Sequence, residues 1–264
     1  MISEERKIYL KRIKRENIII NILRISLFII ILVIWELLSK FNIIDVFMFS
    51  SPSKIFNTII SLYKENNLFI HIFTTLFEII ISFIIGNIIG FIISSILYLN
   101  RRLNKIIDPY LTILNSLPKV SLGPLIIILF GANIKSIIIM ALLISTIVSI
   151  MNLLSSFNNT DKSRIKIMKS MGANKYDIFF KVIIPSNYYE VIEGAKVNIS
   201  LVFIGVIMGE YLVSKQGIGY LINYGSQILN MNLVLTGIFL LIILTIILYL
   251  LINLTDFLIK KYRH

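Results

Sequence analysis

The stretch KSMGANKYDIFFKVIIPS, residues 169–186, is a polar island in a chain whose mean hydropathy is +0.88. Just before and within it, Ile165, Met168 and Met171 recur at helical spacing behind Thr160, a good N-cap, while lysines occupy other positions. This pattern predicts a short amphipathic helix that begins after Thr160.

The quoted stretch then predicts a hinge and a second short helix. Gly172–Ala173 ends the first helix, because glycine adopts a left-handed geometry that a Cβ disfavours. Asn174, with Asp177 three residues later, restarts a helix in the manner of a capping box, and Pro185 marks the entry to the next apolar run. We therefore expect two short helices, joined at a glycine, that project from the hydrophobic part of the chain.

The rest of the chain is typical of a polytopic membrane protein, because 57% of its 264 residues are hydrophobic and these lie in long runs. Hydropathy predicts about six transmembrane helices of roughly 20 residues or more. The candidate spans are residues 18–38, 68–99, 106–130, 134–154, 188–213 and 233–258. We expect an all-α fold with a basic segment at 1–17 and a single transmembrane domain over 18–264, which includes a loop at about 157–186.

The distribution of positive charge predicts the orientation of the chain. Of 26 Lys and Arg residues, 18 lie in four short segments, which are residues 1–17, 101–105, 157–186 and 260–263. Short cytoplasmic segments of membrane proteins gather Lys and Arg. We therefore expect both termini and the polar island in the cytoplasm, and we interpret the net charge of +12 as topogenic. Nucleic-acid binding is not expected, since the basic residues are divided among these segments without an aromatic platform.

Several kinds of site are excluded by composition. The chain has no cysteine and only His71 and His264, which excludes a disulfide framework, a thiolate metal site and a His-rich metal site. It has no P-loop and no Walker aspartate, so we expect no cofactor in this chain and no ATPase activity of its own. An intramembrane enzyme that uses a carboxylate dyad of Glu36 and Glu78 stays open, although no motif supports it.

Polar residues inside the apolar spans are the candidates for a solute pathway or gate. Ionisable side chains at bilayer depth are costly and usually face a bundle interior, and a broken helix is tolerated there only where protein or water surrounds it. The candidates are Glu78, Lys196 and Glu210, with Asn115, Pro118 and Lys119 at a proline-bearing break in the third span. Pairing at an interface or a packing kink would account for the same residues without a pathway.

The polar island fits two roles: a basic amphipathic segment resting on anionic membrane lipid, or a helix pair that docks in a groove of a soluble partner. The spacing from Gly172 through Val182 to Ile184–Pro185 resembles the EAA loop of binding-protein-dependent ABC importer permeases. Three further stretches resemble, in order, the nitrate/sulfonate/taurine class of these permeases, which includes importers of thiamine-pyrimidine precursors and riboflavin. They are SSPSKIF (50–56), SLPKVSLGPLIIILFGANIKS (116–136) and GEYLVSKQGIGYLI (209–222).

The resemblance implies a type I importer permease in the cell membrane of a prokaryote that moves a small solute inward. It implies a homodimer, a cytoplasmic ABC ATPase dimer that binds ATP-Mg, and an extracytoplasmic substrate-binding protein. Coupling to the ATPase would fall on Ile165, Met168, Met171, Gly172, Ala173, Asp177 and Pro185. An ion-gradient-driven secondary transporter is the alternative, but such proteins often pair their broken helices and only one broken span is present here.

The chain also departs from the class that it resembles. Within the loop, Lys166 and Met168 replace the Glu and second Ala of the EAA triplet, and Tyr189 replaces a proline. Glu78 and Lys196 stand where arginines are common in the second and fifth spans. Because the Gly172 hinge and Pro185 are intact, docking is expected to be retained, whereas Glu78 leaves the substrate class open.

Overall fold

The computed structural model describes residues 4–65 and 67–262, and every regular element within these ranges is a helix. The long helices are α1 (Glu4–Lys40), α4 (Leu68–Leu99), α7 (Ile134–Asn158), α11 (Tyr188–Val213) and α13 (Met231–Tyr262). Each of these 5 helices contains a stretch long and apolar enough to cross a membrane. The predicted all-α fold is thus confirmed. Residues 1–3 and 263–264 of the predicted cytoplasmic ends lie outside the described residues.

The third candidate span is broken. It consists of α5 (Arg101–Ser116), the 3₁₀ helix η1 (Lys119–Leu122) and α6 (Gly123–Phe130), and its two halves meet at 87°. Leu117 is extended, with φ −66° and ψ 141°, because Pro118 disfavours a helical residue before it. The break predicted at Pro118 is confirmed, but the two halves are not one straight crossing. Among the described residues there are therefore five continuous candidate spans, or six if the bent pair counts as one.

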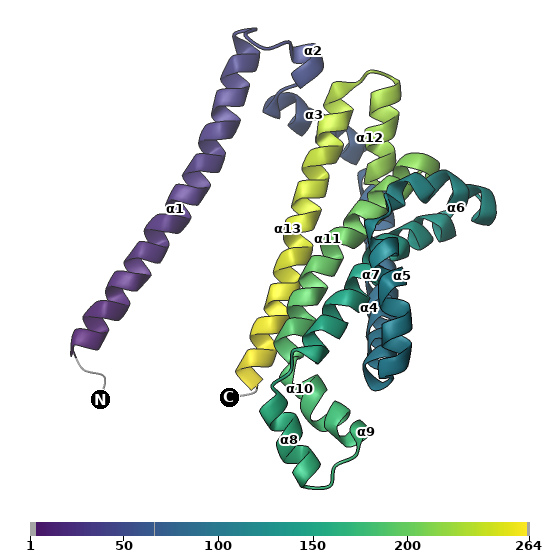
Figure 1. Ribbon diagram of the computed structural model, residues 1–264. Coiled ribbons are helices and arrows are strands. Elements are labelled where there is room, and N and C mark those ends of the chain that lie inside the picture. Colours follow the sequence, from purple (N-terminus) through teal and green to yellow (C-terminus); the bar gives the residue numbers. More distant parts are fainter. Residues whose placement is uncertain (1–3, 66, 263–264) are drawn as a thin grey trace.

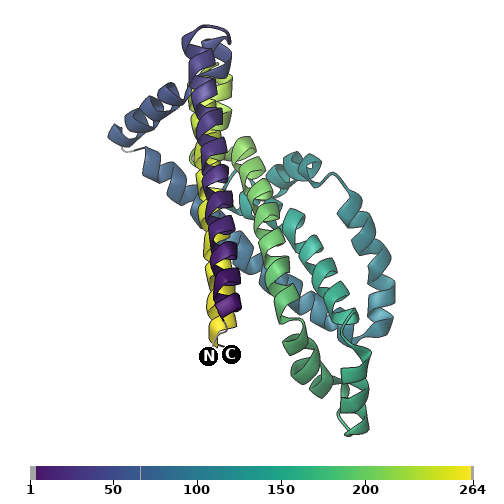
Figure 2. The same cartoon turned by 90° about the vertical axis from the view of Figure 1, so that its left-hand side faces the viewer.

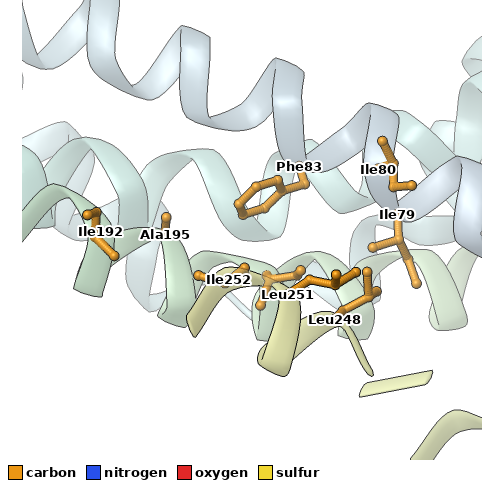
Figure 3. A pocket seen from close by; sticks show the side chains of 9 residues that line it. Ile79, Ile80, Phe83, Ile192, Ala195, Leu248, Leu251 and Ile252 are labelled. Atoms are coloured by element: carbon orange, nitrogen blue, oxygen red, sulfur yellow. The ribbon is translucent and has the colours of Figure 1, made fainter. Parts of the chain in front are cut away.

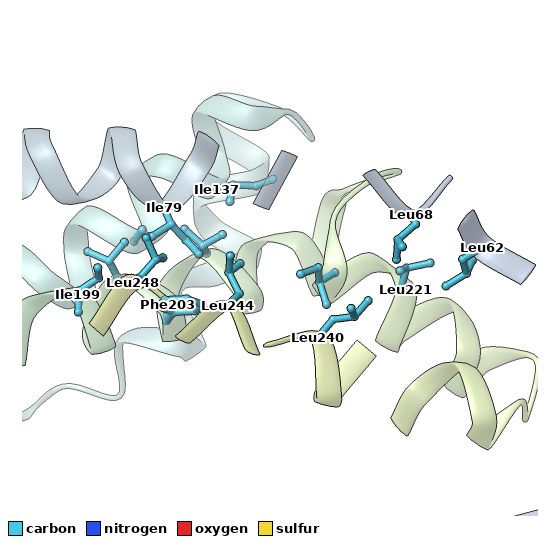
Figure 4. Packing of buried hydrophobic residues seen from close by; sticks show 14 of the residues in the cluster. Leu62, Leu68, Ile79, Ile137, Ile199, Phe203, Leu221, Leu240, Leu244 and Leu248 are labelled. Carbon is cyan, nitrogen blue, oxygen red and sulfur yellow. The ribbon is translucent and has the colours of Figure 1, made fainter. Parts of the chain in front are cut away.

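The centre of the fold is a close bundle of α4, α7 and α11, backed by α13 (Figures 1 and 2). Gly205 of α11 faces Ala141 of α7 so closely that a Cβ added to the glycine would lie 3.0 Å from the Ala141 backbone nitrogen. Small residues at such positions let helix backbones approach where no hydrophobic driving force exists between them. Figure 4 shows apolar side chains of α4, α11 and α13, among them Ile79, Phe203 and Leu244, packed together in the buried core.

Helix α1 stands apart from the bundle in Figure 1, and within its apolar stretch, Ile18–Lys40, only Ser39 is buried. After it come α2 (Val46–Phe49) and α3 (Pro52–Lys64). The Ser51 hydroxyl caps α3 by accepting the Lys54 N–H at 3.3 Å, and α3 buries Ile55 and Leu62.

The two ends of the bundle differ in what they carry. One end, which we call the α8 end, carries α8 (Lys162–Ser170), α9 (Lys175–Ile178) and α10 (Ile184–Ser186), together with the first turn of α1 and the last turn of α13 (Figures 1 and 2). The other, the α12 end, carries α2 and the turn from α12 (Ile218–Gln227) to α13. The first turn of α1 and the last turn of α13 therefore lie on the same side as the polar island. The cytoplasmic location of this side stays a prediction.

Candidate functional site

A helical hairpin projects from the α8 end between α7 and α11 (Figure 1). Gly172 has φ +81° at its tip, which confirms the left-handed hinge that the sequence predicts. The N-cap of α8 is Asp161, whose carboxylate accepts the Ser163 N–H at 2.8 Å, so the prediction of Thr160 as the cap is wrong. Hydrogen bonds from the backbone N–H and the side chain of Ser163 lower the pKa of the exposed Asp161 carboxyl.

Thr160 serves instead as a clamp at the base of the hairpin. Its hydroxyl accepts a hydrogen bond from Asn187 Nδ2 at 2.6 Å, and the same amide nitrogen donates to the Ile183 carbonyl at 2.8 Å. Both Thr160 and Asn187 are buried. Because these two residues flank the hairpin, the hydrogen bond between them fixes where it leaves α7 and enters α11.

The second arm of the hairpin begins with the predicted capping box. The Asn174 side chain accepts the N–H groups of Tyr176 and Asp177, each at 2.9 Å, and the Asp177 carboxylate accepts the Asn174 N–H in return. Asp177 also pairs with Lys181 at 2.7 Å, and this bond is the main cause that lowers the pKa of the Asp177 carboxyl. From α9 the arm continues through a π-helical turn, Phe179–Ile183, before Pro185.

The predicted apolar stripe of α8 faces the chain's own core. Ile165, Met168 and Ala173 pack against a buried cluster that includes Phe157 and Phe179. The rings of Phe157 and Phe179 meet edge to face with centroids 5.5 Å apart, which joins the hairpin to α7. Any part of Ile165 and Met168 in docking therefore remains a prediction, and in this structure they hold α8 in place.

Other apolar side chains form the exposed surface of the hairpin. Met171 is 76% exposed, as the docking prediction requires, and Ile167 (61%), Tyr176 (52%) and Phe180 (61%) accompany it. Sequence reasoning missed these three, because it assigned the amphipathic stripe to a partner. An apolar stripe is usually buried against the nearest apolar surface of its own chain. The apolar residues outside the stripe are then the better candidates for contact with a partner.

A second region, at the α12 end, is organised around Glu210 in the last turn of α11. One carboxylate oxygen accepts the Thr75 hydroxyl at 2.5 Å and the other accepts the Gly219 N–H at 2.6 Å. Gly217 has φ +107°, and a Cβ there would collide with the Glu210 carboxylate. A Cβ on Gly219 would lie 2.9 Å from that of Glu210. The glutamate and the Gly-x-Gly that follows it are therefore one structural unit.

The loop between α11 and α12 is fastened to α4. His71 Nδ1 accepts the Gly217 N–H at 3.0 Å, and the Thr75 hydroxyl accepts the Ile218 N–H at 2.8 Å. The ring of His71 also stacks on Tyr220 at 5.8 Å. We call these contacts the loop latch. They occupy polar backbone groups that would otherwise be unpaired in a buried position.

Glu78 lies one helical turn below Thr75 and is 1% exposed. A hydrogen bond joins its carboxyl group to that of Glu210. The structure thus pairs Glu78 with Glu210, whereas the sequence left open a dyad of Glu78 with Glu36. Glu36 instead accepts the Ser53 N–H at 3.0 Å and the Ser53 hydroxyl at 2.7 Å.

The remaining pathway candidates lie elsewhere. Lys196 forms an ion pair with Glu193 of its own helix at 2.7 Å. Asn115 and Lys119 flank the break beside Pro118, where Lys119 Nζ donates to Asn115 Oδ1 at 3.0 Å. The structure thus brings Glu78 and Glu210 together and leaves Lys196 and the break as separate places. Their parts in a solute pathway stay predictions.

Two cavities near these residues differ in chemistry. A pocket of about 260 Å³ at the α12 end is lined by Glu78 and by polar side chains of two other elements, namely Asn133, Ser214, Lys215 and Gln216. A pocket of about 320 Å³ between α4, α11 and α13 is lined by aliphatic and aromatic side chains such as Phe83, Ile192 and Leu251 (Figure 3). The second pocket offers no charged side chain to a polar solute.

Comparison with known proteins places the chain in a family. Residues 86–261 match the family described as binding-protein-dependent transport system inner membrane component. The chain belongs to this family. The matched region includes α7, the hairpin, Glu210 and its glycines, whereas Thr75 and Glu78 precede it.

Curated relatives of the chain have several named substrates. The formylaminopyrimidine transport permease protein ThiX of Halalkalibacterium halodurans is 25% identical over 73% of this chain and 76% of its own length. The riboflavin permease protein RibX of Chloroflexus aurantiacus is 26% identical over 62% of this chain and 61% of its own. The taurine permease protein TauC of Escherichia coli is 20% identical over 82% and 80%, respectively.

The fold is shared with a solved transporter. A chain of the MetNI methionine ABC transporter, in an inward-facing conformation, superposes with a TM-score of 0.64 over 75% of this chain and 97% of that chain, at 18% identity. This likeness supports a type I ABC importer permease fold. Within residues 4–65 and 67–262, no three His, Asp or Glu side chains are placed to hold a metal ion.

Proposed function

We propose that this chain is the membrane subunit of an ABC importer, which moves a small solute inward while a separate subunit hydrolyses ATP. The observation that carries the proposal is the projecting hairpin at the α8 end. It exposes Met171, Ile167 and Phe180, although it is anchored by buried aromatic rings and by the Thr160–Asn187 clamp. A rigidly held element that exposes large apolar side chains outside the apolar spans is suited to dock on another protein.

The partner on this surface would be a cytoplasmic ABC ATPase. Two copies of this chain would enclose the pathway, two ATPase subunits would bind ATP-Mg, and an extracytoplasmic binding protein would deliver the solute. This chain is then a transport subunit without its own ATP chemistry. The proposal places the α8 end in the cytoplasm of a prokaryote, in agreement with the Lys and Arg of that end.

The hairpin is connected to the helices that a transporter must move. Its first arm continues from α7 and its second leads into α11, which pack closely along their length through Gly205 and Gly209. Movement of an ATPase bound to the hairpin would therefore shift α7 and α11 as a pair. Alternating access follows if ATP-bound and ATP-free partners prefer different positions of that pair.

The solute that we propose is of the kinds named for the relatives: an aliphatic sulfonate, nitrate, taurine, or a vitamin or vitamin precursor. These relatives share the family with this chain and differ from one another in solute. The pocket beside Glu78 and the break at Asn115, Pro118 and Lys119 are the candidate contacts along the pathway, with Lys196 as a further candidate.

A pull-down tests the proposal. The tagged chain is purified from native membranes beside a variant in which residues 161–184 are replaced by a flexible linker, and co-purifying proteins are identified by mass spectrometry. We expect a soluble protein with a P-loop to accompany the intact chain and to be lost from the variant. Met171→Asp, on the exposed surface, should weaken this association, whereas Ile43→Asp, an exposed residue at the α12 end, should not. Recovery of the intact chain alone would overturn the proposal.

A further inference from the structure

Glu78 and Glu210 are two acidic side chains that lie in contact inside the membrane domain. Each is 1% exposed, and a hydrogen bond joins their carboxyl groups. An ionised carboxylate has acceptors only, so two carboxyl groups can hydrogen-bond to each other only if a proton lies between them. Two unscreened negative charges in contact at this depth would also repel strongly.

The surroundings decide which carboxyl holds the proton. Glu210 accepts hydrogen bonds from Thr75 and from the N–H groups of Gly219 and Tyr220, which suits an anion. Glu78 has one oxygen without a partner, which suits a neutral carboxylic acid better than a carboxylate. Glu78 is therefore the proton donor and Glu210 the acceptor.

Other ionisable groups around the pair do not neutralise it. His71 accepts the Gly217 N–H at Nδ1, so its own proton is at Nε2 and the ring is neutral in this arrangement. Lys215 lines the same pocket as Glu78, but it is exposed and its charge is screened by solvent. On the other elements, Tyr220 of α12 stacks on His71, and Lys135 at the start of α7 is exposed.

We infer that Glu78 and Glu210 form a binding site for a single proton, which is reached through the pocket at the α12 end and holds the loop latch closed. Glu78 lines that pocket of about 260 Å³, so the proton can exchange with solvent without crossing the bundle. Glu210 is bonded to Thr75 of the latch. Loss of the proton would leave two adjacent charges that push α4 and α11 apart. This inference concerns the chain itself and does not depend on the identity of the solute or of the ATPase.

Carbodiimide labelling tests the proton directly. Dicyclohexylcarbodiimide adds to protonated carboxyl groups in apolar surroundings, so treatment of the full chain in detergent followed by peptide mass spectrometry reports the protonated residue. We expect one adduct, on Glu78, that decreases as the pH is raised from 6 to 9. Glu36, whose carboxylate accepts two hydrogen bonds from Ser53, is the internal control. Absence of an adduct on Glu78, or equal labelling of Glu36, would overturn the inference.

A pair of variants tests the latch. The amide of Glu78→Gln can still donate to Glu210, so this variant should be about as stable as the wild type near neutral pH. Its unfolding equilibrium should not depend on the titration of the pair. In the wild type, the unfolding equilibrium constant should rise about tenfold per pH unit between the titration of an ordinary carboxyl group and that of the folded pair, because over this interval the folded chain holds a proton that the unfolded chain releases. In Glu210→Gln, the amide NH2 must face the donor of either Thr75 or Gly219, so this variant should be less stable at every pH. Parallel pH profiles for the wild type and Glu78→Gln would contradict the proposal.

Discussion

The contact between α7 and α11 allows a prediction whose size follows from the geometry. In Gly205→Ala, the new Cβ would lie 3.0 Å from the Ala141 nitrogen and 3.1 Å from its Cβ, and closer still to its Cα. Ordinary contacts begin near 3.4 Å, so the helices must separate by at least about 0.4 Å, and the obstacle is backbone that cannot rotate away. Overpacking of this kind costs about 1–3 kcal/mol, and we expect the upper half of that range.

The same helix provides a matched control. Gly194→Ala places a Cβ where no atom lies within 4 Å, so it should show only the gain in helix propensity, up to about 1 kcal/mol. Because both variants share that gain, their difference isolates the clash. The assay is thermal unfolding of green-fluorescent-protein fusions in detergent, where about 2–4 °C corresponds to 1 kcal/mol for a chain of this size. If Gly205→Ala were as stable as Gly194→Ala, close packing of α7 on α11 would be refuted.

Three further predictions concern the latch, the clamp and the hinge. Thr75→Val removes the hydroxyl that bonds both Glu210 and Ile218, and it should reduce the free energy of unfolding by about 1–3 kcal/mol. Thr74→Val is the control and should cost less, because that hydroxyl bonds a carbonyl of its own helix. Equal losses of stability in thermal unfolding would exclude the latch. Asn187→Ala removes the hydrogen bond to Thr160 and should speed proteolysis of the hairpin about tenfold. Asn159→Ala, at an exposed position, should leave the cleavage rate unchanged. Identical cleavage rates for the two variants would show that the clamp is unimportant. At Gly172, asparagine tolerates the left-handed backbone and valine does not, so Gly172→Val should reduce ATPase co-purification and Gly172→Asn should retain most of it. Equal co-purification would mean that the turn geometry is not needed for docking.

Local features of this fold could be predicted from the sequence because their causes lie within a few residues. The positive φ of Gly172, the capping box of Asn174 and Asp177, and the break at Pro118 each depend on neighbouring backbone geometry. The assignment of Thr160 as a cap failed although it is local. The adjacent Asp161 is an equally good cap, and Asn187, 27 residues away, engages the Thr160 hydroxyl.

The candidate site was predicted only in part, because its members come from distant helices. The unit of Glu210, Gly217 and Gly219 spans ten residues, and its spacing alone suggests that the loop turns back on the glutamate. The partnership of Glu210 with Thr75 and Glu78 depends on the rotation of α4 against α11. Periodicity does not fix that rotation, because α4 is apolar on nearly all sides. The sequence also did not predict which apolar residues of the hairpin are exposed. Periodicity identifies the apolar stripe, but it does not show whether the chain's own core or a partner covers that stripe.

Site-specific crosslinking tests the central claim most directly. The chain has no cysteine, so Met171→Cys introduces a single thiol at the tip of the hairpin, and Ile43→Cys introduces one at the opposite end of the bundle. A thiol–amine crosslinker is applied to native membranes, and the products are identified by mass spectrometry. We expect a crosslink from position 171 to a protein that carries a P-loop, and none from position 43. No crosslink to such a protein from position 171, with the chain intact in the membrane, would contradict it.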